Sequence, residues 1–233
     1  MEYYRTRNVR ATNGDFLRNL TPVVKMFLFL NISVFVIQYT FGEIFHVRFF
    51  ASTLQNIDNK VVVNFSEFVK IFALYVPYLK KYLLVSQFVT HQFLHSGIVH
   101  LAFNMITLSM IGPLVERQIG SRSFLKLYIM GGIFAGFFNL LFVNAYSNSL
   151  LGASGAICAI FATFALTNPN MKVCLIGIPV AIKPKTILII YAVVTIVLAI
   201  ISSSNIAHVA HLGGLLFGYL YYKNIFKLKK FIG

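Results

Sequence analysis

Charged residues are scarce in this chain: they make up 11% of its 233 residues, against about 25% in an ordinary soluble domain. Hydrophobic residues make up 58%, which leaves too little polar surface for a water-soluble globule of this size. The same composition excludes disordered, collagen-like and coiled-coil chains, which need polar, glycine-periodic or heptad-charged sequences. The class that remains is a polytopic membrane protein.

Cysteine is also scarce, and tryptophan is absent. Two cysteines, Cys158 and Cys174, are too few for a disulfide framework. No carboxylate or cysteine cluster accompanies His91, His95 and His100, which argues against a metal site. We therefore expect the protein to use neither a metal ion nor another cofactor.

Acidic residues number only 6 against 20 Lys and Arg, which gives a formal charge of +14. On a soluble chain this excess would suggest a nucleic-acid partner. Here the basic residues lie between and outside long apolar runs, where they set membrane orientation, and no basic face is interleaved with a stacking platform. We expect the lipid bilayer as partner and no nucleic acid.

Long apolar runs dominate the sequence. A membrane-spanning helix needs about 20 mostly apolar residues. Six apolar runs approach this length. Two other apolar pieces, 71–79 and 173–182, are too short to span a membrane, and Pro179 interrupts the second. We therefore expect an all-α bundle of six transmembrane helices. The six runs that approach the required length are 22–41, 97–115, 124–143, 150–167, 186–202 and 206–222.

The distribution of Lys and Arg predicts the orientation. Segments on one side of the predicted membrane carry 15 of these residues and the long loop 42–96 on the other side carries 5, which places both termini in the cytoplasm. The first run follows a long polar leader without a clear cleavage site, so we expect a retained helix and no signal peptide. The predicted division is a cytoplasmic arm (1–21), a membrane domain (22–222) and a basic cytoplasmic tail (223–233).

Four polar residues within the predicted spans are functional candidates, because polar groups are costly in hydrocarbon. They are His100 and Asn104 in the second span, Ser154 in the fourth and His211 in the sixth. Even-numbered spans run inward from the outer face, so His100, Ser154 and His211 all fall about 5–8 Å along their helices from that face. Unrelated packing residues would not be expected to share one layer.

Ser154 lies between Gly152 and Gly155 at the start of a predicted helix, where a substrate backbone can approach its hydroxyl. The alternative is a small-residue packing patch. A base is also needed, and Gly214 and Gly218 would let the sixth span bring His211 close to Ser154.

Two alternatives to this base stay open. His208 lies one turn earlier than His211, nearer the outer end, and is the weaker candidate for the base. Either histidine could also be a purely structural, hydrogen-bonded residue in the bundle.

His100 and Asn104 are four residues apart and project from one helix face. Two neutral donors there suit an oxyanion hole, although a pair of interhelical hydrogen bonds would explain them equally well. No Asp or Glu lies in any predicted span, so we expect a Ser–His dyad without a carboxylate.

Several motifs together resemble the rhomboid family of intramembrane serine proteases, in its bacterial six-transmembrane form. The resemblance implies Ser154 as the nucleophile and His211 as the general base. It implies an oxyanion hole formed by His100, Asn104 and the backbone N–H of Ser154. The motifs that carry it are His91–Asn104, Gly112–Ser121, Gly152–Ala156 and Ala210–Gly214 followed by Gly218.

The resemblance also assigns supporting residues. His95 matches a structural histidine at a loop-to-helix junction, and Glu116 with Arg117 matches a pair that ties loop and helix ends together. Gly152, Gly155, Gly214 and Gly218 are implied as supporting glycines. One position departs from the family: Cys158 stands where an aromatic residue often stacks on the catalytic histidine, so the base is held more loosely here or by another aromatic.

The function implied is hydrolysis of peptide bonds in or near transmembrane segments of membrane proteins, in the bacterial cytoplasmic membrane. Implied substrates have one span, with helix-weakening residues near the outer face. Two alternatives are a catalytically silent relative that binds membrane helices, and a transporter or channel that uses the same polar layer. The sequence leaves the oligomeric state open.

Overall fold

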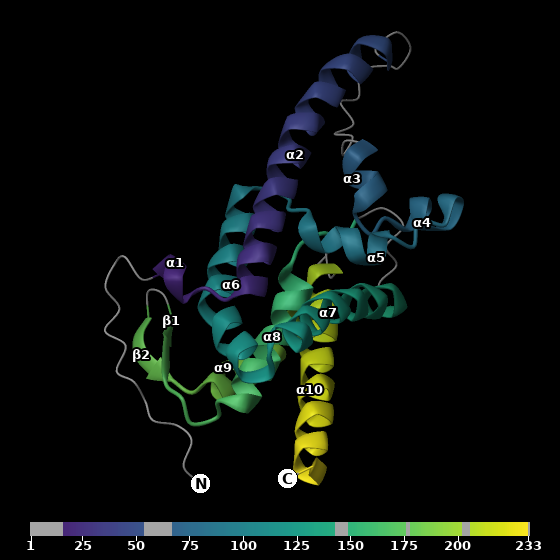
Figure 1. Ribbon diagram of the computed structural model, residues 1–233. Coiled ribbons are helices and arrows are strands. Elements are labelled where there is room, and N and C mark those ends of the chain that lie inside the picture. Colours follow the sequence, from purple (N-terminus) through teal and green to yellow (C-terminus); the bar gives the residue numbers. More distant parts are fainter. Residues whose placement is uncertain (1–15, 54–66, 143–148, 176–177, 202–205, 233) are drawn as a thin grey trace.

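The computed structural model describes residues 16–53, 67–142, 149–175, 178–201 and 206–232, most of which are helical (Figure 1). Shorter elements flank the six longer helices: α1 (Phe16–Asn19), α3 (Glu67–Phe72), α4 (Val76–Tyr82), α5 (Gln87–Thr90), the 3-10 helix η1 (His91–Phe93), and strands β1 (Val173–Leu175) and β2 (Ile178–Ile182). The longer helices are α2 (Pro22–Thr53), α6 (Ile98–Ile119), α7 (Ser121–Phe142), α8 (Ser154–Thr167), α9 (Pro184–Ile201) and α10 (Ile206–Ile232).

Four helices in the described ranges are long and apolar enough to cross a membrane: Pro22–Thr40 within α2, and all of α6, α7 and α9. Helix α8 is apolar but has only 14 residues, and α10 carries two histidines and a lysine-rich end. The helical membrane class is therefore confirmed, whereas the count of six spans remains a prediction.

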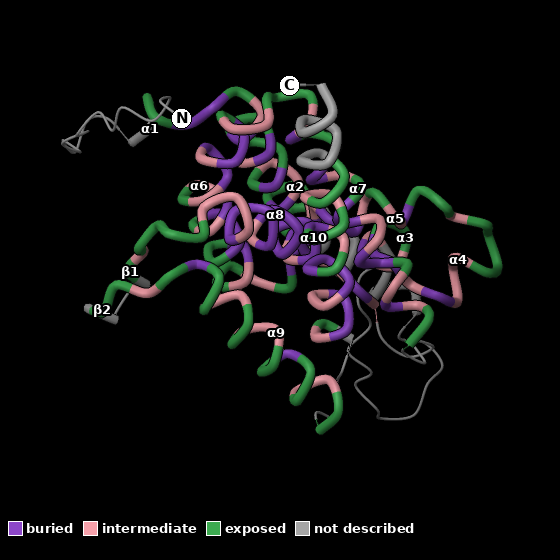
Figure 2. The backbone as a smooth tube through the Cα atoms, turned by 90° about the horizontal axis from the view of Figure 1, so that it is seen from below, coloured by how far each residue is buried: buried purple, intermediate pink, exposed green. Residues whose placement is uncertain are grey.

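Helix α8 lies at the centre of the bundle (Figure 2). Ten of its 14 residues are buried, and most of these are alanine, glycine or isoleucine. Small side chains allow neighbouring backbones to approach closely, which is the main source of helix association in a membrane. Helix α9, by contrast, lies at the edge of the bundle and exposes most of its length.

Glycines on α10 allow its close contact with α8. A Cβ atom added at Gly214 would collide with the carbonyl oxygen of Gly155, and one added at Gly218 would collide with that of Ala159. Both helices therefore touch through their backbones along this strip. His211 lies one turn before Gly214, so the same contact carries its side chain to the start of α8.

The segment between α2 and α6 supports the loop that precedes α8. The backbones of Leu74 and Leu150 exchange two hydrogen bonds, of 2.9 and 3.1 Å. Gln87 is fully buried and bonds the backbone at Lys70, Ile71 and Tyr75, which holds this segment together. The predicted loop 42–96 thus contains helical residues: the end of α2 up to Thr53, and the short helices of residues 67–93.

Glu116 joins the end of α6 to the beginnings of α2 and α7. Its carboxylate is buried and accepts four hydrogen bonds, which satisfies free N–H groups in the first turn of α2. Arg117 donates to the backbone carbonyl of Asn19. The donors to Glu116 are Thr21 Oγ1, Val23 N, Val24 N and Ser121 Oγ, at 2.5, 3.2, 3.0 and 2.6 Å.

Several helix ends differ from the predicted spans. Helix α2 continues to Thr53 instead of ending at 41, and α10 continues to Ile232 through the predicted basic tail. Residues 150–153 are not helical, because Leu150 pairs with Leu74 and Gly152 has a positive φ, so α8 begins at Ser154. Hydropathy marks the apolar part of a helix, whereas backbone hydrogen bonding continues until a cap or a breaker ends it.

Strands β1 and β2 form an antiparallel hairpin that was not predicted. The apolar run 173–182 is too short to span, and three residues of β1 pair with residues of β2: Val173 with Ile182, Cys174 with Ala181 and Leu175 with Ile178. The register shifts between Cys174 and Leu175, which leaves Pro179 and Val180 of β2 without a partner in β1, and a missing N–H is tolerated at such a bulge.

Candidate active site

Ser154 is the first residue of α8. The preceding Gly152 has φ +121°, in the left-handed region that glycine adopts without strain, and its N–H donates to the carbonyl of His91 at 2.8 Å. The first N–H groups of a helix have no partner within it and give that end a partial positive charge. The Ser154 hydroxyl therefore lies where a developing negative charge is favoured.

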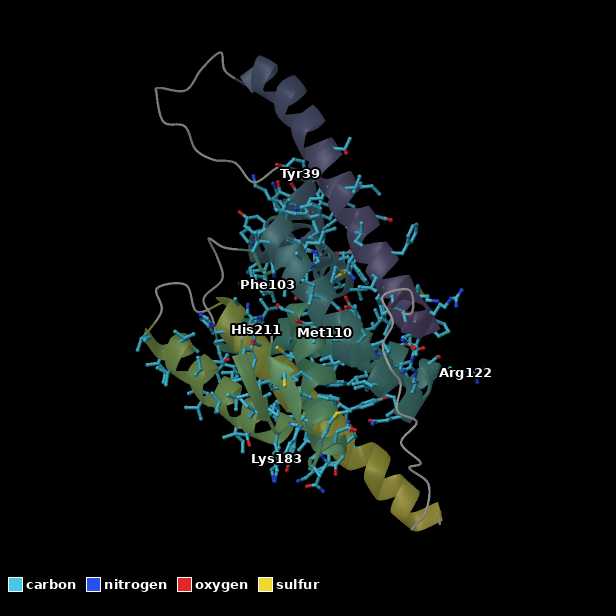
Figure 3. The ribbon with its side chains drawn as sticks, turned by 90° about the vertical axis from the view of Figure 1, so that its left-hand side faces the viewer. Tyr39, Phe103, Met110, Arg122, Lys183 and His211 are labelled. Atoms are coloured by element: carbon cyan, nitrogen blue, oxygen red, sulfur yellow. The ribbon has the colours of Figure 1, made fainter. Side chains whose placement is uncertain are left out.

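His211, on α10, meets Ser154. Its Nε2 lies 2.8 Å from the Oγ of Ser154, although the two residues are 57 apart in sequence. Figure 3 shows His211 within the bundle, well apart from Lys183, the residue before α9. This distance is hydrogen-bond length, so a proton can pass from the hydroxyl to the imidazole.

His208, the alternative base, is half-buried one turn before His211. The hydroxyl of Ser154 bonds to His211, and no hydrogen bond joins it to His208 in the described residues. The geometry favours His211 of the two.

A third side chain, which the sequence reasoning did not identify, contacts His211. The hydroxyl of Tyr191, on α9, lies 3.1 Å from His211 Nδ1, and the two rings lie 6.2 Å apart at 34°. Cys158 Sγ lies 3.7 Å from the same hydroxyl. A signal was present: Leu188, Tyr191 and Thr195 fall on one helical face, which makes Tyr191 a polar aromatic on the inward side of a span.

His100 lies beside the loop before Ser154. A Cβ atom added at Gly152 would lie 2.9 Å from its Nε2, so only glycine leaves room for the ring. The hydroxyl of Ser96 lies 3.1 Å from Nδ1. When Ser96 donates this bond, Nε2 carries the hydrogen and becomes a donor directed at the loop.

Asn104 lies one turn after His100 on α6 and is 6% exposed. Its side-chain Nδ2 is buried and has no hydrogen-bond partner among the described residues. A buried donor without a partner is costly, so Asn104 Nδ2 is available to bond an acceptor that enters the site. The structure thus leaves Asn104 with the donor that an oxyanion hole requires.

His95 and His91 are buried beside this region. The backbone of His95 exchanges two hydrogen bonds with the Gln38 side chain, and its ring meets His100 edge-on at 5.1 Å. Burial lowers the pKa of both His91 and His95, so their rings are neutral at physiological pH. Within the described residues, no three His, Cys, Asp or Glu side chains form a group suited to a metal ion.

Comparisons with known proteins identify the family of this chain. Residues 84–227 match the family model described as the rhomboid domain. Over 129 residues the chain is 35% identical to "Rhomboid protease GluP" of Bacillus subtilis (strain 168), covering 54% of this chain and 23% of that protein. Over 140 residues it is 29% identical to "Rhomboid protease GlpG" of Yersinia pestis (strain Pestoides F), covering 60% and 48%.

A third relative is "Presenilin-associated rhomboid-like protein A, mitochondrial" of Danio rerio, 29% identical over 136 residues, which are 57% of this chain and 36% of that protein. The chain therefore matches between about a quarter and a half of the length of these relatives. The family model itself spans more than half of the chain and includes Ser154 and His211. The chain is an integral membrane protein that belongs to the rhomboid family.

Proposed function

We propose that this chain is an intramembrane serine endopeptidase with Ser154 as nucleophile and His211 as general base. The observation that carries the proposal is the 2.8 Å contact between Ser154 Oγ and His211 Nε2. A serine hydroxyl is a weak nucleophile until a base within hydrogen-bond reach takes its proton. A packing role for Ser154 would not require a histidine at this distance.

In the proposed reaction, Ser154 Oγ attacks the carbonyl carbon of the scissile peptide bond as its proton moves to His211 Nε2. The tetrahedral adduct collapses when His211 returns that proton to the leaving amine, which leaves an acyl group on Ser154. A water molecule then loses a proton to His211 and attacks the acyl carbon, which releases the carboxyl product and restores the serine.

The negative oxygen of the tetrahedral adduct requires hydrogen-bond donors. We assign them as His100 Nε2–H, Asn104 Nδ2 and the backbone N–H of Ser154. The close approach of the His100 ring to Gly152 and the unpaired Asn104 amide support this assignment. The free N–H groups at the start of α8 further stabilise the negative charge on this oxygen.

The proposed substrates are membrane proteins with one transmembrane segment that contains helix-weakening residues near the outer face. We propose the bacterial cytoplasmic membrane as the location, with both termini in the cytoplasm and six spans. Two of the relatives are named rhomboid proteases, which supports proteolysis over transport. A catalytically silent relative is the second candidate, and the presence of both dyad residues in hydrogen-bond contact argues against it.

Labelling with a fluorophosphonate tests the proposal directly, because this reagent traps only an activated serine. We expect the purified chain in detergent to cleave a model transmembrane substrate and to carry the label on Ser154, located by mass spectrometry of its peptides. Folded protein that neither cleaves nor reacts would support the silent alternative. A label at another serine would overturn the assigned nucleophile.

The oxyanion hole gives a second prediction. Loss of one donor typically lowers kcat by about 10²- to 10³-fold, and sharing among three donors reduces the effect of each. We expect Asn104→Ala to lower kcat more than it raises KM, because the bond strengthens as the oxyanion forms. His100→Ala should be more severe, since the ring also packs against Gly152.

The double variant of His100 and Asn104 separates this role from packing. Two donors that serve one oxygen should give a less than additive loss in kcat. Wild-type rates in both single variants, measured on folded protein, would show that these side chains are structural and that the oxyanion donors lie elsewhere.

A further inference from the structure

Tyr191 extends the dyad by one side chain. Its hydroxyl lies 3.1 Å from His211 Nδ1, on the opposite side of the imidazole from Ser154, and 3.7 Å from Cys158 Sγ. Three consecutive contacts therefore connect the hydroxyl of Ser154, through the His211 imidazole and the Tyr191 hydroxyl, to the thiol of Cys158. Each distance lies within reach of a hydrogen bond, with the longer one involving sulfur.

Among the side chains that the structure describes, no carboxylate is hydrogen-bonded to His211. Three acidic residues lie in the described ranges: Glu43 in α2, Glu67 in α3, and Glu116, whose oxygens are occupied by donors at the other end of α6. Serine proteases commonly orient the base with a third group that accepts a hydrogen bond from Nδ1–H. Here the phenol oxygen of Tyr191 occupies the place of that acceptor.

Resting on the proposed function, we propose that Tyr191 is a positioning residue that holds His211 in its base-competent tautomer and orientation. Nε2 must be free of hydrogen to accept the Ser154 proton, so Nδ1 carries the hydrogen and donates it to the phenol oxygen. The phenol O–H is then directed at Cys158 Sγ. When His211 becomes an imidazolium, both of its N–H groups keep a partner, and no proton leaves it for Tyr191.

Packing fixes the phenol in this place. Tyr191 belongs to the inward stripe of α9 together with Leu188 and Ala192, which packs on Cys158 and on Leu215 of α10. The ring of Phe161 meets Tyr191 edge-on, with centroids 6.4 Å apart at 84°. The rest of α9 is largely exposed, so this stripe is the part of the helix that packs against α8 and α10 beside Ser154 and His211.

Cys158 explains why the support comes from α9. It lies one turn after Ser154 on α8, is 6% exposed, and has a side chain too short to cover the His211 ring itself. A larger residue there would occupy the space into which the phenol reaches. Tyr191 thus supplies from a neighbouring helix the aromatic contact that Cys158 does not.

The test compares two tyrosine-to-phenylalanine changes. Tyr191→Phe keeps the ring and removes only the hydroxyl at His211. Tyr221→Phe removes a hydroxyl of the same kind, which donates to the Ser123 carbonyl at 2.7 Å, away from the site. Both purified variants and the wild type are assayed for kcat, KM, rate of inactivation by a fluorophosphonate, and thermal unfolding.

We expect Tyr191→Phe to lower kcat and the inactivation rate about 10- to 100-fold with KM unchanged, the range for one hydrogen bond to a group that becomes charged. Tyr221→Phe should leave both rates within about twofold, the effect expected of a hydrogen bond that serves packing alone. Equal rates for Tyr191→Phe and wild type would overturn the positioning role. A matching loss in both variants would do the same, because it would show a general effect on folding.

The same assays separate this inference from the proposed function. A wild type that does not cleave, or a Ser154→Ala variant that does, contradicts the protease itself. Cleavage that depends on Ser154 but not on the Tyr191 hydroxyl contradicts only the positioning role.

Discussion

Ser154→Ala is expected to remove proteolysis almost completely, by about 10⁴-fold or more in kcat. Removal of a serine nucleophile leaves only what substrate binding and the oxyanion donors supply. The fold should persist, because the change deletes one hydroxyl whose hydrogen bond goes to His211, and the neighbouring residues Ala153 and Gly155 are already small. Cleavage of a model transmembrane substrate and the unfolding temperature, measured on the same preparation, check both statements.

Ser109→Ala is the matched control. It makes the same chemical change in a membrane helix, where the Ser109 hydroxyl bonds the Ile106 carbonyl of its own helix at 2.8 Å. This variant should cleave at the wild-type rate and unfold at nearly the same temperature. A Ser154→Ala protein that cleaves normally would end the protease proposal, whatever the control shows.

The membrane class could be predicted from composition alone, and the family match and the apolar helices confirm it. In hydrocarbon every backbone polar group needs an internal partner, so long apolar runs must be helical. The ends of the helices could not be predicted in the same way. Residues 223–232 contain neither glycine nor proline, so α10 continues past its apolar part to Ile232.

The contact between Ser154 and His211 could be anticipated from the glycines around both residues. A strip of Gly214 and Gly218 predicts close approach to another helix, and the small residues near Ser154 predict which helix that is. The roles of these residues in catalysis remain predictions. The similar depths of His100, Ser154 and His211 in their predicted spans also indicated that these polar groups would share one layer.

The contact of Tyr191 with His211 was not predicted from the sequence. This contact depends on how α9 is rotated about its axis, and a nearly uniform apolar helix carries little information on that rotation. The stripe of Leu188, Tyr191 and Thr195 becomes visible only when tyrosine and threonine are treated as inward polar residues. The hairpin at 173–182 was missed because a short apolar run fits a strand as well as a buried helix.

His211→Ala is expected to lower kcat by about 10⁴-fold or more, whereas His208→Ala should keep it within a few-fold of wild type. The reason is geometric: Nε2 of His211 lies 2.8 Å from the nucleophile. Three residues earlier on a helix, a side chain is rotated by about 60° and displaced by about 4.5 Å along the axis. Cleavage rates and fluorophosphonate labelling of Ser154 should fall together in His211→Ala, because both require an activated hydroxyl.

The pair of histidine variants is a demanding comparison because both residues lie on α10, one turn apart, and both are half-buried. A general disturbance of this helix would lower activity in both variants, and the unfolding temperature would reveal it. Loss of activity in His208→Ala alone would show that His208 is the base and would require α10 to turn about its axis when substrate binds. Loss in His211→Ala alone, with normal folding, is the result that the 2.8 Å contact predicts.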